Sequence, residues 1–273
     1  MAVLCLADSL EDLKRRLART IVAYDAESEP VTVADLGIEG AMAMLLKDAL
    51  RPNLVQTIEG SPAFVHGGPF ANIAHGTNSL LADELGLALG DYLVTEAGFA
   101  ADLGFEKFCN IVSRRGVSPD ATVLTTAVRS MKYHGLDMWP ADYDRLEEPD
   151  PEAVRAGLPN LDHHAGIIER FGVPFVVAIN RFPTDTDAEI EAIIDHCEAQ
   201  GYPVVVSEAF GEGGAGAADL AETARDLADS DRGSFEPLYD LDASLREKIR
   251  TVAVEVYGAE GVHFTESAAD DLD

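Results

Sequence analysis

Short apolar runs rich in β-branched residues alternate along the chain with longer segments of helical periodicity. Five of these runs are predicted strands, at residues 53–60, 91–98, 121–129, 173–182 and 202–210. Such an alternation is typical of βαβ units, in which parallel strands form a sheet and the connecting helices cover it. We therefore predict an α/β fold that has a parallel sheet with helices on both faces.

Capping residues indicate where several of the helices begin and end. Ser9, followed by an acid three residues later, predicts a helix over residues 10–24, and Thr32 or Asp35 opens another that continues to residue 50. Two further helices are expected over residues 71–89 and 186–200, and Gly201 ends the second of these.

Residues 136–159 interrupt the alternation. The stretch is acidic and contains Pro140, Pro149, Pro151 and Pro159. We expect it to form an acidic surface insertion between a first part, residues 1–135, and a second α/β part, residues 160–273.

The charge balance is strongly acidic and limits the partners that the chain can have. The sequence has 49 Asp and Glu residues against 20 Lys and Arg, which gives a formal net charge of −29. Nucleic acid is therefore not an expected partner. The acids lie in segments of helix and strand periodicity, so the charge belongs to a folded surface. Near 1 M salt the Debye length falls to about 3 Å and screens the repulsion, which favours a salt-loving source.

The hydropathy pattern does not predict a membrane protein. No stretch approaches the roughly 18 apolar residues of a membrane span, and the first residues lack a basic region and a cleavage site. We expect no membrane partner and a cytoplasmic location. Cys5, Cys109 and Cys197 are scattered and odd in number, so buried thiols are expected instead of disulfides or a zinc site.

Polar residues follow each of the five predicted strands. In an open parallel sheet, ligands bind beyond the carboxyl ends of the strands. Ordinary turn residues would explain one or two polar clusters at these places, but they explain five poorly. We therefore expect a binding site along this edge, formed by residues 56–59, 95–98, 126–129, 180–185 and 207–210.

Two further features have the chemistry of an anion site. Arg129, Lys132 and His134 form a basic cluster after a predicted strand in a chain that has few cations. The loop from His66 through Gly67 and Gly68 to residue 69, a proline suited to a first helical position, either binds an anion at a helix start or is a tight turn that needs glycine. The sequence leaves both readings open.

Neither a phosphate-binding loop nor a metal site is predicted. The glycine-rich stretch at residues 210–217 matches neither G-x-x-x-x-G-K-[ST] nor G-x-G-x-x-G. No group of Asp, Glu and His has the spacing of metal ligands, so no tightly bound transition metal is expected.

Taken in order, these segments resemble the formate–tetrahydrofolate ligase family. The resemblance is carried by VQTIEGSPAFVHGGPFANIAHG, DYLVTEAGFAADLGFEKF, SMKYHG, VPFVVAINRFPTDT and SEAFGEGGAG. It implies a P-loop-NTPase-like α/β fold and an ATP-dependent ligation of formate to tetrahydrofolate. In this family formyl phosphate is the intermediate and 10-formyltetrahydrofolate the product. ATP would carry Mg²⁺, bound mostly by a segment that is expected to lie outside this chain.

The resemblance also implies roles for particular residues. Catalytic or anion-binding roles fall on Arg129, Lys132, His134 and His66. Binding of tetrahydrofolate or nucleotide falls on Phe182, Pro183, Phe210, Asn180, Glu96, Phe99, Gly67 and Gly68. Phe182 and Phe210 would flank the pterin, and Phe99 would stack on the adenine unless it packs beneath the following helix.

This sequence departs from the family pattern at three of its motif positions. Ala127 and Leu136 stand where the basic motif has a threonine and a second glycine, and Phe210 stands where the family usually has a tryptophan. Leucine disfavours a positive φ angle, which puts the tightness of the loop after Gly135 in doubt.

The family begins with a segment that carries the phosphate loop and ends with a further domain, and neither is expected in this chain. On this reading residues 1–135 are the remainder of a nucleotide-binding domain and residues 160–273 carry the folate platform. The active ligase would need a separate N-terminal fragment, and the resemblance also allows a homo-oligomer and a bound monovalent cation. The alternative is a non-catalytic remnant, or a folate-binding module without ATP turnover.

Overall fold

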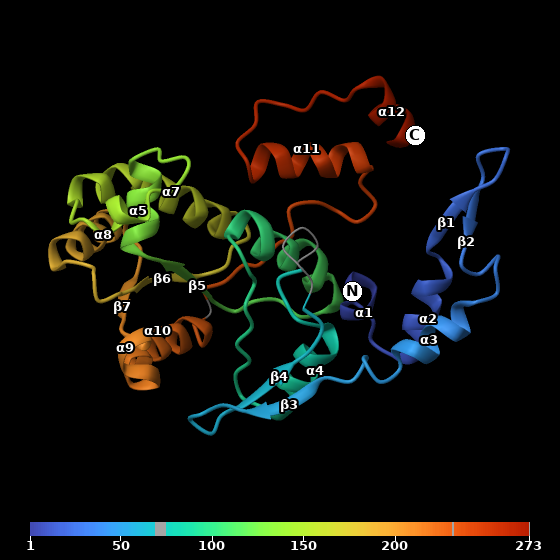
Figure 1. The fold of residues 1–273 in the computed structure, drawn as a ribbon, viewed down its shortest axis with the longest axis horizontal. Coiled ribbons are helices and arrows are strands. Elements are labelled where there is room, and N and C mark those ends of the chain that lie inside the picture. Colours follow the sequence, from blue (N-terminus) through green and yellow to red (C-terminus); the bar gives the residue numbers. More distant parts are fainter. Residues whose placement is uncertain (69–74, 231, 273) are drawn as a thin grey trace. The chain divides into compact units, whose positions relative to one another are not determined.

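The computed structural model describes residues 1–68, 75–230 and 232–272. The chain divides into two compact units, Met1–Val117 and Ser118–Asp273 (Figure 1). This division lies before the expected boundary at residue 135, so the basic cluster that begins at Arg129 belongs to the same unit as residues 160–273.

Unit 2 is built on a parallel sheet of three strands, β5 (Thr122–Thr126), β6 (Phe175–Asn180) and β7 (Val204–Ser207), in the order β5-β6-β7. β6 is the central strand, and its residues Phe175 to Ile179 are all buried. The prediction of an α/β fold with a parallel sheet is confirmed for this unit. The run that forms β6 is buried on both faces of the sheet, as expected for a central parallel strand, whereas β5 and β7 are only partly buried.

Helices cover both faces of this sheet (Figure 1). One face carries α5 (Val128–Gly135), α7 (Pro151–Arg170) and α8 (Asp187–Gln200), and the other carries α9 (Ala209–Glu212) and α10 (Ala218–Ala228). α8 begins in a capping box between Thr186 and Glu189 and ends at Gly201, whose φ is +78°, as the sequence predicts. The unit also contains α6 (Tyr143–Glu147), η5 (Gly213–Ala217), α11 (Leu245–Glu255) and α12 (Glu266–Leu272).

α7 crosses the end of the stretch that was expected to be a surface insertion. Asp150 caps this helix and Pro151 opens it, because proline suits the first helical turn. Val154 and Leu158 are buried, so residues 151–159 contribute to the core of unit 2. Although residues 136–159 are acidic in composition, their last part, residues 151–159, forms a helix with one buried face.

Unit 1 consists of short helices and two antiparallel hairpins. Its elements are α1 (Ala2–Cys5), α2 (Leu10–Ala18), β1 (Ile21–Tyr24), β2 (Pro30–Thr32), α3 (Glu39–Leu46), β3 (Asn53–Gln56), β4 (Pro62–Val65), α4 (Leu80–Leu89), the π-helical turns η2 (Ala101–Phe105) and η3 (Phe108–Val112), and the 3₁₀ turn η4 (Ser113–Arg115). An apolar core joins α1, α2 and α3 through Leu4, Ala7, Leu13, Leu17, Ala43 and Leu50.

Several element predictions in unit 1 are wrong. The helix expected from Thr32 or Asp35 to residue 50 covers only Glu39–Leu46, and the helix expected over residues 71–89 is not formed at residues 75–79 and begins at Leu80. The helix that Ser9 caps ends at Ala18, and the β-branched residues after it form β1. Residues 53–56 form an exposed strand in an antiparallel hairpin with β4, not a buried parallel strand. Residues 91–98 are described by the structure but form no strand. The expected helix start at residues 71–74 lies outside the described residues.

In the described residues, none of the helices combines the length and the apolar character needed to cross a membrane. Cys5, Cys109 and Cys197 are buried free thiols, as expected, and burial raises the pKa of each.

Candidate functional site

The carboxyl ends of β5, β6 and β7 meet at one edge of the unit 2 sheet, because the strands are parallel and adjacent. Three of the five predicted clusters therefore share this edge, namely residues 126–129, 180–185 and 207–210. The other two, residues 56–59 and 95–98, lie in unit 1 and belong to no strand of this sheet.

Phe182 and Phe210 lie against each other at this edge. Their ring centroids are 5.1 Å apart and the rings are tilted by 51°. Phe210 is 67% exposed and Phe182 is partly exposed, so neither ring is a core side chain. Pro183, exposed beside them, restricts the backbone of the loop.

The two rings leave no gap for a third ring between them. Aromatic pairs in direct contact have centroids about 4.5–7 Å apart, so a pterin gripped on both faces would require the phenyl rings to separate. The expected space between the strand ends is therefore filled by the rings themselves. Phe210 is the more exposed of the two rings.

Two hydrogen bonds between Phe182 and Asp185 fix the loop that carries Phe182. The Phe182 N–H donates to Asp185 Oδ2 over 2.8 Å, and the Asp185 N–H donates to the Phe182 carbonyl over 2.9 Å. Burial raises the pKa of Asp185 despite that hydrogen bond and the nearby charges of Lys132 and Arg129. The loop therefore lies within the electrostatic reach of the basic helix α5.

Arg181 links the ends of two strands, a role that the sequence analysis missed. The Arg181 guanidinium lies 3.3 Å from Glu208 and 2.8 Å from Asp187. The Arg181 backbone N–H donates to the Ser207 carbonyl. The signal that could have revealed it is an arginine directly after one strand and a glutamate directly after the next. Asn180 pairs with Ser207 in the register of the sheet, so it is part of the same edge.

Lys132 is buried and forms an ion pair with Glu189, which is also buried. Their side chains are 2% and 0% exposed, and Lys132 Nζ lies 2.9 Å from Glu189 Oε1. Lys132 also donates to the Glu148 carbonyl over 3.0 Å. An anionic ligand could contact this ammonium only if the ion pair opened, which an exposed lysine would not require.

Glu189 is the centre of the hydrogen bonds around this pair. It accepts from the Thr186 N–H and hydroxyl and from the Asp150 N–H. Burial alone would raise the pKa of Glu189, but these hydrogen bonds and Lys132 outweigh burial and lower the pKa to about 2. Glu189 thereby ties together α5, the start of α7 and the end of the Phe182 loop.

Arg129 and His134 are accessible, but they lie at different ends of α5. Arg129 is in the first turn, 46% exposed, and lies 3.5 Å from Glu147. His134 is exposed in the last turn, with its ring edge-on to Tyr133. Five residues of helix separate them by about 7.5 Å along the axis. Of the basic cluster, Arg129 is therefore the cation that the structure places at the carboxyl edge of the sheet with an exposed side chain.

His66, in unit 1, is buried and uses both ring nitrogens within the protein. Nε2 lies 2.6 Å from the Ala49 carbonyl and Nδ1 lies 2.6 Å from the Ser79 hydroxyl. A carbonyl only accepts, so Nε2 carries the proton in this arrangement. Ser79 accepts from the Ala82 N–H and so has its own proton to donate to Nδ1. These bonds join the end of β4 to the start of α4.

Gly67 and Gly68 differ in the space that the structure leaves for a side chain. A side chain at Gly67 would approach the Asn78 carbonyl oxygen to 2.3 Å, and its φ of +60° also favours glycine. Gly68 has a φ of +98° and open space around it. The tight-turn reading therefore has direct support at Gly67. The neighbouring proline at position 69 lies outside the described residues.

Glu96 and Phe99 are exposed on a turn of unit 1. Phe99 is 74% exposed and has a φ of +65°, which is uncommon for a residue other than glycine. The ring therefore does not pack beneath the following helix, which was the alternative to a stacking role. A side chain at Gly104 would lie 1.6 Å from the Ala97 carbonyl, so this glycine allows the turn to lie against η2.

Leu136, which replaces the second glycine of the basic motif, fits the backbone conformation at its position. Leu136 has a φ of −91°, so the expected conflict with a positive φ does not arise, and Asp137 takes the positive φ instead. Gly135 is needed for close packing, because a side chain there would lie 1.9 Å from the Ala153 carbonyl of α7.

Within residues 1–68, 75–230 and 232–272, no group of three or more His, Cys, Asp or Glu side chains has a geometry that could hold a metal ion. Mg²⁺ that accompanies ATP is usually held by one or two carboxylates together with the phosphates. The geometry assigns no particular carboxylate to that ion.

Comparison with known proteins tests the family resemblance. A family model described as formate–tetrahydrofolate ligase matches residues 1–273. A formate–tetrahydrofolate ligase from Haloarcula marismortui is 55% identical over 276 residues, which cover 100% of this chain and 50% of the relative. One from Haloquadratum walsbyi is 54% identical and is covered to 48%. The chain thus spans about half the length of these curated relatives. The resemblance is confirmed, and the chain belongs to the formate–tetrahydrofolate ligase family.

Proposed function

We propose that this chain is part of an ATP-dependent ligase that joins formate to tetrahydrofolate and yields 10-formyltetrahydrofolate. Family membership supports the reaction class, and the two relatives from halophilic archaea support a salt-loving source. A cytoplasmic location is part of the proposal. The observation that carries the proposal is the pair of accessible aromatic rings, Phe182 and Phe210, at the carboxyl edge of a parallel sheet.

The chemistry divides into two steps in this proposal. A formate oxygen attacks the γ-phosphorus of ATP, ADP leaves, and formyl phosphate forms. The N10 nitrogen of tetrahydrofolate then attacks the formyl carbon, phosphate leaves, and N10 loses its proton. Mg²⁺ bound together with ATP would supply the neutralisation of phosphate charge that phosphoryl transfer needs.

Arg129 is the residue that we assign to the anionic side of the reaction. It is exposed in the first turn of α5, where its closest charged partner is Glu147 at 3.5 Å. We assign Lys132 to fixing this helix against the Phe182 loop, because its ammonium is already paired with Glu189. Glu96 and Phe99 are our candidates for the adenine side, and His66, Gly67 and Gly68 for shaping the nearby turn of unit 1.

The remaining contacts come, in this proposal, from the half of the ligase that the curated relatives have outside the matched region. A P-loop-like phosphate site would belong to that half, because this sequence has no match to such a loop. The competing function is folate binding without ATP turnover. The two differ in whether the chain, combined with the other half, consumes ATP.

Tetrahydrofolate binding tests the aromatic platform. We expect the Phe210→Ala change to weaken binding several-fold, because one aromatic stacking contact contributes about 0.5–1.5 kcal/mol beyond the buried area. Tyr143→Ala is the matched control, since Tyr143 and Phe210 are both 67% exposed. Isothermal titration calorimetry in molar KCl, with and without the other half, gives the dissociation constants. Equal effects of the two changes would remove Phe210 from the site.

A further inference from the structure

Unit 1 leaves apolar side chains exposed on segments whose sequence predicts buried strands. Leu54 is 61% exposed, Val94 is 94% exposed and Ile58 is fully exposed. Single exposed apolar residues are ordinary in monomeric proteins. Strand-forming runs with an uncovered apolar face are different, because they offer a surface for pairing with another chain.

Residues 91–98 have one covered face and one uncovered face. Leu93 packs onto α4 at Gly86, where a side chain would come within 2.6 Å of the leucine. Its neighbours Tyr92 and Val94 are 52% and 94% exposed. Alternate side chains of an extended segment point to opposite sides. The segment therefore has the side-chain pattern of a strand that packs on α4 with one face and, among the described residues, leaves its other face exposed.

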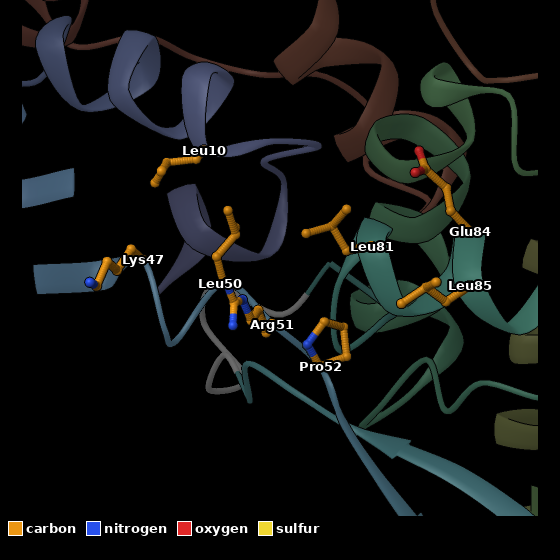
Figure 2. Close-up of a pocket in the computed structure, with 8 residues that line it drawn as sticks. All are labelled: Leu10, Lys47, Leu50, Arg51, Pro52, Leu81, Glu84 and Leu85. Atoms are coloured by element: carbon orange, nitrogen blue, oxygen red, sulfur yellow. The ribbon is translucent and has the colours of Figure 1, made fainter. Parts of the chain in front are cut away.

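An apolar groove lies beside the same helix (Figure 2). It has a volume of about 420 Å³ and is lined by residues of α2, of α4 and of the segment that follows α3. Leu50 and Leu81 in this groove are continuous with the core of the unit. Its charged lining residues are Lys47, Arg51 and Glu84. The groove is thus an apolar surface that continues from the hydrophobic core of the unit.

The length of the relatives indicates what covers these surfaces. The matched region is 50% of one curated ligase and 48% of the other, so each contains about as much chain again. We propose that residues 91–98 and the groove form the docking surface for that other half of the ligase. Its apolar side chains cover Tyr92 and Val94 and fill the groove. This inference rests on the proposed function, because it identifies the partner that completes the enzyme.

Sedimentation in molar KCl tests the docking directly. The probe is the part of the Haloarcula marismortui ligase outside the match, produced as a separate polypeptide. We expect it to form a complex with the 273-residue chain. Val94→Lys and Leu85→Lys should each weaken the complex at least tenfold. Both side chains are exposed, at 94% and 40%, so the substitutions should leave the fold intact. Leu241→Lys, at a site 64% exposed in unit 2, adds the same charge elsewhere and should leave the complex unchanged.

Three results would overturn the docking proposal. The first is the absence of a complex, and the second is equal binding by the Val94, Leu85 and Leu241 variants. The third is a dimer of the chain alone that Val94→Lys dissociates, which would assign the surface to a second copy. A complex that forms but releases no ADP in the presence of formate would contradict the proposed function and leave the docking surface standing.

Discussion

Glu189 shows how a single buried carboxylate can hold a functional loop in place. It faces Lys132, caps α8 through Thr186 and accepts from the backbone of Asp150. Replacing one partner of a buried pair leaves the other charge uncompensated, which costs about 3–5 kcal/mol. We expect Glu189→Gln to lower the free energy of unfolding by that amount at pH 7. Glu191→Gln, exposed on the same helix, should change it by less than about 0.5 kcal/mol.

The same pair predicts a pH dependence. The pKa of Glu189 falls from 4.5 to about 2 on folding. A carboxyl whose pKa is lowered in the folded state contributes stability above its unfolded pKa and loses it as the pH falls. The Glu189 contribution should therefore disappear between about pH 4.5 and pH 2. Chemical denaturation followed by circular dichroism across this range would show it, and equal pH profiles for wild type and Glu189→Gln would contradict it.

At the scale of elements, α5 and α7 cross with their backbones in contact. A side chain at Gly157 would lie 2.0 Å from the Met131 carbonyl, whereas one at Gly166, in the same helix, would meet nothing within 4 Å. We expect Gly157→Ala to destabilise the protein by about 1–3 kcal/mol, which is typical of overpacking. Gly166→Ala should stabilise it by about 0.5–1 kcal/mol, because alanine favours a helix. Denaturant unfolding of both variants would decide, and equal effects would contradict the close crossing.

The elements of unit 2 could be predicted because their signals are local. The apolar runs that become β5, β6 and β7 pair with one another inside this unit, and the capping box of Thr186 with Glu189 lies within one turn of helix. Residues 91–98 could not be predicted correctly by the same rules. A strand needs a neighbour for its backbone hydrogen bonds, and sequence periodicity does not say whether that neighbour belongs to the same chain.

The sequence predicted the positions of some candidate site residues and not the environment of others. The resemblance indicated Phe182 and Phe210, and the parallel strands bring the two residues together. It also treated Arg129 and Lys132 as equivalent cations. Their difference depends on Glu189, which is distant in sequence and reaches Lys132 only through the packing of α8. Burial of a lysine beside such a partner is a tertiary effect that no motif spacing expresses.

For the whole molecule, the charge predicts a dependence on salt. A net charge of −29 opposes compaction unless counterions screen it, and screening is largely complete near 1 M salt. The thermal midpoint should rise between 0.1 M and 2 M KCl, with most of the rise below about 1 M. Sucrose of equal osmolality separates screening from solute exclusion. A midpoint that does not change with KCl would contradict this expectation.

Release of ADP that depends on both formate and tetrahydrofolate tests most directly whether this chain is one half of a ligase. In molar KCl the chain alone and the other half alone should release none, and their mixture should release ADP at a measurable rate. Arg129→Ala should lower that rate far more than Arg155→Ala, whose side chain is similarly exposed and similarly paired with a glutamate. Substrate-dependent ADP release by the chain alone, or none from a mixture in which the two halves associate, would contradict the proposal.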